Sequence, residues 1–201
     1  MFWDRVAGVY DIFANVINRR THKILCGAVA ERILSTDEVL ECACGTGMLS
    51  RVIAPRCKSL IAEDLSENML KKAWRKCAQL QNVTFRQGNI LDLKYSAERF
   101  DVVVAANVIH LLDEPLRALR EMDRVCKKGG RLIIPTYMNG KDDGSTNSIS
   151  GAIGKAGADF KREFTLSSYE QFFKDAGYTD AEYIWCPGKV PCAVAVLHKK
   201  A

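Results

Sequence analysis

The chain has 201 residues, of which 48% are hydrophobic and 26% are charged, and its formal net charge is +5. These values fit one globular domain and argue against a disordered or fibrous chain. The basic excess is small and forms no long basic run, so a dedicated nucleic-acid-binding protein is not expected.

The cysteines and the N-terminal residues indicate in which cellular compartment the protein is expected. Eight cysteines occur without a C-x-x-C pair of zinc spacing, so neither a metal site nor a disulfide framework is expected. The first residues lack a basic leader followed by an apolar run, and no apolar stretch approaches the roughly 20 residues of a membrane helix. We therefore expect a cytoplasmic protein with reduced, mostly buried thiols and no transmembrane segment.

Strand and helix patterns alternate along most of the chain. Residues 3–34 carry apolar side chains at helical spacing, which predicts two amphipathic helices separated near 18–21. Five short apolar runs then predict strands at 39–43, 59–64, 82–88, 100–108 and 131–137. Start and stop signals between them predict helices at 48–54, 66–80 and 113–126.

The last part of the chain has a different pattern. A predicted helix at 167–176 precedes two apolar runs, 181–186 and 192–198, which the short loop PGKVP joins as an antiparallel hairpin. Strands that alternate with helices form a parallel sheet with right-handed crossovers. The predicted fold is therefore α/β, a doubly wound, mostly parallel seven-stranded sheet with one antiparallel edge strand and helices on both faces.

A single domain is expected over residues 1–201. Its N-terminal helical part, 1–36, is predicted to form a cap. The segment 138–165 is rich in Gly, Ser, Asn and Asp, which predicts a lid or substrate segment.

A glycine turn and an acid mark a candidate nucleoside site. Gly45 and Gly47 follow the first predicted strand, where open parallel sheets bind nucleotide-like ligands. Asp64 ends the next strand, and a carboxylate there can accept both ribose hydroxyls. Each feature also has a purely structural interpretation, a tight turn or a helix cap. Ser50 replaces the third glycine of the NAD fingerprint, which argues against a pyrophosphate ligand.

Four segments in order resemble the successive motifs of class I methyltransferases that use S-adenosylmethionine (SAM): VLECACGTG, LIAEDLSENMLKKA, NVTFRQGNILDL and FDVVVAANVIHLLDEPLRALREMDRVCKKGGRLII. The pattern is most similar to the group that includes the ubiquinone and menaquinone biosynthesis methyltransferases. The resemblance covers residues 39–137. It implies a Rossmann-like fold, SAM as cofactor and S-adenosylhomocysteine (SAH) as product.

The resemblance also implies a set of cofactor-binding residues after the first four strands. Asp64 would hold the ribose, Met69 would lie near the adenine, and Asn107 with Val108 would line the methyl end. Asn89 stands where family members commonly carry Asp, so a weaker contact with the adenine amino group is expected. The full set is Cys42, Ala43, Gly45, Gly47, Asp64, Leu65, Met69, Asn89, Ile90, Asn107 and Val108.

The reaction would be a direct displacement at the sulfonium methyl carbon, with the protein supplying position and, where needed, a base. His110, just past the fourth strand and expected to face the mouth of the pocket, is the candidate base, with a packing role as the alternative. Tyr10 and Tyr137 are candidates for contact with the methyl end or the acceptor. His22 and His198 are expected to have no role in the reaction.

The acceptor is expected to be a small molecule. The sequence NVIH after the fourth strand lacks the Pro-Pro and aromatic residues usual in methyltransferases of nucleic-acid bases or glutamine amides. A lipid or quinone acceptor at a membrane surface is compatible with an apolar lid. Two alternatives stay open: an RNA methyltransferase with a basic rim at 138–161, and a non-catalytic SAM-binding or scaffold protein.

Overall fold

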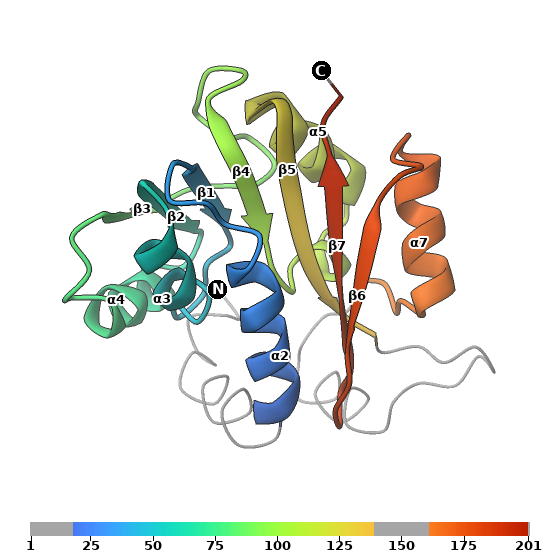
Figure 1. The fold of residues 1–201 in the computed structure, drawn as a ribbon, viewed down its shortest axis with the longest axis horizontal. Helices are drawn as coiled ribbons and strands as arrows, with labels where there is room; N and C mark the ends of the chain where they lie inside the picture. The colour runs from blue at the N-terminus through green and yellow to red at the C-terminus, as the bar shows by residue number, and fades with distance from the viewer. Residues whose placement is uncertain (1–17, 139–160, 201) are drawn as a thin grey trace.

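The computed structural model describes residues 18–138 and 161–200. A seven-stranded sheet in the order β3-β2-β1-β4-β5-β7-β6 forms its centre, as Figure 1 shows. The strands are β1 (Glu38–Cys42), β2 (Ser59–Asp64), β3 (Val83–Gln87), β4 (Phe100–Ala105), β5 (Cys126–Tyr137), β6 (Glu182–Cys186) and β7 (Cys192–His198). The described helices are α2 (Arg19–Ala30), α3 (Ser50–Ile53), α4 (Glu67–Lys76), α5 (Pro115–Val125) and α7 (Leu166–Asp175), with 3-10 turns η2 (Ala54–Arg56) and η3 (Ile109–Leu111).

The sheet topology confirms the predicted fold class. Strands β1 to β5 pair in parallel with their neighbours, while β7 pairs antiparallel with both β5 and β6. The reversed strand therefore lies one place in from the edge, and β6 is the outermost strand. The other outermost strand is β3.

Apolar side chains that alternate along the strands form a core on each face of the sheet. Val103 of β4 packs into a cluster with α5 and α7, whereas Val102 and Val104 pack into a cluster with α2 and α3. This two-residue alternation explains why the run in β4 is almost wholly apolar, since both faces of the strand are covered. Helices cover both faces, as predicted (Figure 1).

Several element boundaries differ from the sequence-based expectations. The predicted helix at 48–54 is only Ser50–Ile53, followed by a 3-10 turn that contains Pro55. The predicted start at Asp113 is wrong, because Pro115 occupies the first turn of α5 and Glu114 is its N-cap. The predicted strand at 131–137 begins earlier, because β5 starts at Cys126 and its irregular first part contains Gly129 and Gly130.

Helix α2 is anchored to the loop that joins β6 and β7. Its N-cap residue, Asn18, donates to the Val190 carbonyl at 2.8 Å and accepts from the Val190 nitrogen at 3.2 Å. The predicted break near 18–21 therefore coincides with the start of this helix. The first predicted helix and most of the predicted lid, 139–160, lie outside the described residues.

Two further expectations concern the burial of the cysteine thiols and the presence of a membrane-spanning helix. All eight cysteines are free, and seven are buried, which confirms the prediction that most of them act as small buried hydrophobes. In 18–138 and 161–200, no helix is both long and apolar enough to cross a bilayer.

Candidate cofactor-binding and methyl-transfer site

The candidate cofactor residues gather at one edge of the sheet. Cys42, the last residue of β1, pairs with Glu63 on one side and with Ala105 on the other. Asp64, the last residue of β2, pairs with Gln87, the last residue of β3. The loops after these four strands therefore leave the sheet side by side, at the carboxyl edge where open α/β sheets bind ligands.

The glycine turn after β1 has an unusual backbone. Ala43, Gly45 and Gly47 all have positive φ angles, of 51°, 56° and 81°. A Cβ atom added to Gly47 would lie 3.1 Å from Ala73 of α4, so glycine lets this helix pack on the turn. Among residues 18–138 and 161–200, nothing lies within 4 Å of a Cβ atom added to Gly45, so these parts of the chain leave the outer side of the turn open. An open, glycine-lined turn suits close approach of a ligand.

Asp64 is held in place by the turn that it faces. Its Oδ2 accepts a hydrogen bond from the Gly45 nitrogen at 2.8 Å, and its Oδ1 accepts one from the Ser66 nitrogen at 2.9 Å. Ser66 also caps α4 by accepting from the Met69 nitrogen, as predicted. An ionised carboxylate has about four acceptor positions. These two backbone bonds therefore orient both carboxylate oxygens of Asp64 at the carboxyl edge of the sheet.

A second acid, which the sequence analysis missed, lies beneath the glycine turn. Glu41 of β1 is buried and accepts a hydrogen bond from the Ser50 hydroxyl at 2.6 Å. The pKa of Glu41 is raised to about 8, chiefly by burial and also by the nearby Asp64, although the Ser50 hydrogen bond acts to lower it. The sequence does contain a signal for this acid. Glu41 lies at an inner position of the apolar run VLECA, and an acid is costly to bury there unless it is hydrogen-bonded or paired.

The loop after β3 carries the candidate adenine contacts. Asn89 accepts a hydrogen bond from the Leu91 nitrogen at 3.0 Å, which uses one of two lone pairs on its amide oxygen. The base of this loop is fixed by Tyr95, whose hydroxyl donates to the buried Glu63. A Cβ atom on Gly88 would collide with the Glu63 carboxylate. Glu63, Tyr95 and Gly88 thus set the position of the loop.

The end of β4 is tied to β5 and β7. Asn107 has a positive φ of 52°, its nitrogen donates to the Pro135 carbonyl at 2.7 Å, and its Oδ1 lies 3.9 Å from the Cys192 sulfur. Val108 beside it is buried at the same edge. The loop that carries both residues is therefore fixed against β5.

The buried side chains of His22, His110 and Tyr137 lie near one another beyond the end of β4. The hydroxyl of Tyr137, at the end of β5, lies 2.7 Å from Nε2 of His22 in α2. The His110 ring lies 6.2 Å from the Tyr137 ring, centroid to centroid. His22, which was expected to have no role in the reaction, is 6% exposed and is hydrogen-bonded to Tyr137, a candidate site residue.

The prediction that His110 faces the pocket mouth is wrong. It is 2% exposed, and burial lowers the pKa of its imidazole to about 4. A group with that pKa is neutral at neutral pH and accepts a proton weakly. His198 lies at the opposite end of the sheet, 3.9 Å from Glu182, and Tyr10 lies outside the described residues.

Comparison with known proteins identifies this architecture. Residues 40–134 match a family model described as a methyltransferase domain. That segment runs from β1 to β5 and contains the glycine turn, Asp64 and the loops after β3 and β4. Residues 40–134 form a SAM-dependent methyltransferase domain.

Two curated relatives share this domain. An uncharacterized methyltransferase of Schizosaccharomyces pombe is 29% identical over 157 residues, covering 73% of this chain and 55% of that protein. A demethylmenaquinone methyltransferase of Staphylococcus carnosus is 31% identical over 145 residues, covering 65% of this chain and 60% of that protein. The matches thus span little more than half of each relative.

Solved structures share the fold of the methyltransferase domain and its flanking elements. A chain from the complex of the Haloferax volcanii Trm112 methyltransferase activator with a putative methyltransferase has a TM-score of 0.78, at 18% identity, covering 99% of this chain and 98% of that one. A putative SAM-dependent methyltransferase of Methanococcus maripaludis has a TM-score of 0.73, at 19% identity, covering 100% and 95%. A [4+2]-cyclase also matches, with a TM-score of 0.73 at 18% identity, covering 89% and 80%. The fold alone therefore does not determine the reaction.

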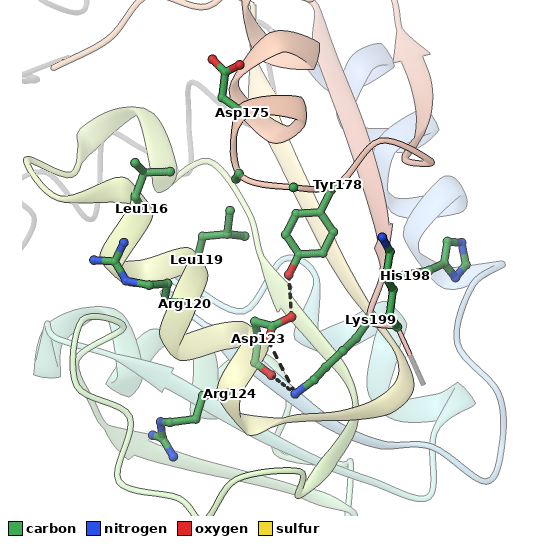
Figure 2. A pocket seen from close by; sticks show the side chains of 12 residues that line it. Leu116, Leu119, Arg120, Asp123, Arg124, Asp175, Tyr178, His198 and Lys199 are labelled. Carbon is green, nitrogen blue, oxygen red and sulfur yellow. Dashed lines mark hydrogen bonds and ion pairs between the residues drawn. The ribbon is translucent and has the colours of Figure 1, made fainter.

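A hollow of about 770 Å³ lies at the opposite edge of the sheet, between α5, the end of α7 and the end of β7 (Figure 2). Asp123 at its centre accepts from the Tyr178 hydroxyl at 2.6 Å, and Lys199 lies 3.6 Å from the same carboxylate. Lys199 also donates to the carbonyls of Asp123 and Cys126. These polar groups satisfy one another, and they lie far from the glycine turn, so this hollow is not the candidate methyl-transfer site.

Proposed function

We propose that this protein binds SAM at the carboxyl ends of β1 to β4 and transfers its methyl group to a small-molecule acceptor. The observation that carries the proposal is the pairing of Asp64 with an open glycine turn. A carboxylate oriented at the end of the second strand suits a ribose, and the glycine turn suits the methionine portion beside it. The predicted set of eleven cofactor-binding residues is retained in this proposal.

The residues at the site would act by positioning. Asp64 and Asn89 would hold the nucleoside, while the glycine turn and Asn107 would align the other end of the cofactor. When bound, SAM supplies the electrophilic methyl group and leaves as SAH. Holding two reactants in line can contribute roughly 7–11 kcal/mol to catalysis in the best cases. We retain 1–36 as the proposed cap and 138–165 as the proposed substrate segment.

A small-molecule acceptor is supported by two observations. The motif NVIH lacks the Pro-Pro-aromatic pattern of enzymes that methylate bases or amides. Among the curated relatives are demethylmenaquinone methyltransferases, whose name describes a quinone-type acceptor. RNA is the competing acceptor, and the net charge of only +5 gives it little support.

The proposal is tested by measuring SAH formation from SAM with separate acceptor pools of phenols and quinols, of amines, and of total RNA. We expect SAH to form with a small-molecule pool and to fall at least 30-fold in Asp64→Ala. Asp113→Ala is the matched control, because that side chain is 80% exposed and outside the candidate site. Turnover with RNA alone would support the RNA methyltransferase, and failure to bind SAH would support a scaffold protein.

A further inference from the structure

Glu41 is a buried acid that has no cationic partner in the described part of the chain. It is 2% exposed, and its carboxyl group accepts a hydrogen bond from the Ser50 hydroxyl at 2.6 Å. Another buried acid, Asp37, differs because it forms an ion pair with Arg131 at 2.6 Å. A carboxylate is costly to bury unless a cation or several donors compensate its charge. A positive charge brought close to Glu41 would therefore be stabilised.

Glu41 lies beneath the turn that would hold the methionine portion of the cofactor. It is two residues before Ala43, where the positive φ angles begin, and Ser50 is the first residue of α3, which follows the turn. The bond between Glu41 and Ser50 therefore joins the two ends of the turn. Asp64, which accepts from the Gly45 nitrogen, is near enough to disfavour a charge on Glu41. The placement of Glu41 beside the cofactor rests on the proposed function.

The other titratable groups near Glu41 are thiols and two cations. Burial raises the pKa of four thiols that interact with it electrostatically, namely Cys26 of α2, Cys42 of β1, Cys44 of the turn and Cys77 after α4. These thiols are therefore uncharged at neutral pH. Arg51 of α3 is exposed, and Lys76 of α4 donates to the Thr46 hydroxyl at 2.8 Å. Neither cation forms an ion pair with Glu41, so Asp64 is the charged group that acts on it.

Glu41 retains its proton at neutral pH in this environment. Burial is the main reason that its pKa is about 8, so roughly nine-tenths of the group is protonated at pH 7. A nearby cation favours the carboxylate form, so the proton is lost more readily when such a cation binds. SAM carries a positive sulfonium, whereas SAH has a neutral thioether and the same amino-acid end. The two ligands therefore differ in the charge that they bring to this buried acid.

We propose that Glu41 is a specificity-determining residue that responds to the sulfonium charge of the cofactor, giving its proton to the solvent when SAM binds and taking one back when SAH is left after methyl transfer. The O–H bond of the carboxyl group breaks in the first step and forms again in the second. The net charge of the site is unchanged on binding, because the positive charge gained with SAM equals that lost with the proton. The carboxylate stabilises the charged cofactor and not its neutral product.

The pH dependence of this preference has a defined direction. At low pH the proton must be removed from Glu41 before its charge can act, whereas at high pH the carboxylate is already present. The affinity for SAM relative to SAH therefore rises with pH. If the pKa of Glu41 falls from about 8 to about 7 when SAM binds, roughly 0.4 of a proton leaves per SAM at pH 7. The affinity ratio would then rise about sevenfold between roughly pH 6 and pH 8.5.

Calorimetric titration in buffers of different ionisation enthalpy counts the protons released per ligand. The α-amino group of each ligand also titrates near pH 8, so the counts are compared with those of Glu41→Gln, which keeps an acceptor for Ser50 but cannot ionise. We expect the excess proton release with SAM over SAH at pH 7 to be at least about 0.3 larger in wild type than in Glu41→Gln. Asp123→Asn, which removes a carboxylate bonded to Tyr178 at the opposite edge of the sheet, is the matched control and should behave as wild type (Figure 2).

A second variant tests the same assignment while Glu41 stays in place. Ser50→Ala removes the hydrogen bond that lowers the pKa of Glu41, so the rise in the SAM-to-SAH affinity ratio should move to higher pH. If Glu41→Gln does not fold, a Ser50→Ala profile identical to wild type would overturn the inference.

Equal excess proton release in wild type and Glu41→Gln would also overturn it, as would the same pH profile of the affinity ratio in both proteins. Folded wild type that binds neither ligand would contradict the proposed function, and this inference with it. Binding of both ligands without the extra proton release contradicts the inference alone, so the two failures are distinguishable.

Discussion

The carboxylate of Asp64 accepts a hydrogen bond from the backbone nitrogen of Gly45 at 2.8 Å, which joins the ends of β2 and β1. The acid and the turn are thus held together before any ligand arrives. The Ser66 nitrogen binds the other carboxylate oxygen, so both oxygens are oriented. Groups that are already in position lose less entropy when a ligand binds, which favours affinity.

The two glycines of the turn should respond differently to alanine. Gly47→Ala places a methyl group 3.1 Å from Ala73 at a φ of +81°, so we expect it to lower the free energy of unfolding by at least about 2 kcal/mol. The methyl group of Gly45→Ala meets no neighbour in the described part of the chain, so only the conformational cost of about 1–2 kcal/mol is expected. Its methyl group would instead stand on the open side of the turn and weaken SAH binding. Urea denaturation and SAH titration of both variants test this contrast, and equal loss of stability would contradict it.

The buried Glu41 should make stability depend on pH. Its pKa is about 8 in the folded protein against an ordinary value of 4.5, so the folded state retains the proton to higher pH. The free energy of unfolding therefore falls as pH rises from about 4.5 to 8, and the full contribution is present only below that range. Glu41→Gln keeps the shape but cannot ionise, so this decrease should be absent.

The measurement is best made between pH 6.5 and 8. The lowered pKa of His110 acts in the opposite direction, but only between its folded value of about 4 and its ordinary value of 6.5. Across the chosen interval, we expect wild type to lose up to about 2 kcal/mol relative to Glu41→Gln. Parallel pH profiles for the two proteins would show that Glu41 is ionised in the folded state throughout.

The hydroxyl of Tyr95 should contribute more to stability than that of the partly buried Tyr183. Tyr95→Phe removes the donor to the buried Glu63, so we expect a loss of about 1–3 kcal/mol in unfolding free energy. In the described part of the chain, the Tyr183 hydroxyl is buried and has no hydrogen-bond partner. Tyr183→Phe is therefore the control and is expected to be neutral or slightly stabilising. Equal effects of the two substitutions on thermal unfolding would contradict the assigned role of Tyr95.

Local sequence signals were sufficient to predict most of the fold. The unbroken run in β4 predicted a strand covered on both faces, and Ser66 predicted the start of α4, because both signals act over a few residues. The position of Asp64 beside the glycine turn followed from the rule that parallel strands end at one edge. The start of β5 was less predictable, since the strand was expected from 131 but begins at Cys126 with an irregular segment that contains Gly129 and Gly130.

The pairing of His22 with Tyr137 could not be predicted in the same way. His22 and Tyr137 come from α2 and β5, and no local pattern relates two residues 115 positions apart. The burial of His110 depends on the core that forms around η3, so its low pKa is a tertiary property. Glu41 differs, since an acid within an apolar strand could have been recognised from sequence alone.

The most direct test of the central claim is calorimetric titration with SAH of wild type, Asp64→Ala and the exposed control Asp113→Ala. We predict micromolar binding by wild type and the control, and at least tenfold weaker binding by Asp64→Ala. Folded wild-type protein that binds neither SAM nor SAH, or an Asp64→Ala variant with unchanged affinity, would contradict the placement of the cofactor at the ends of β1 and β2.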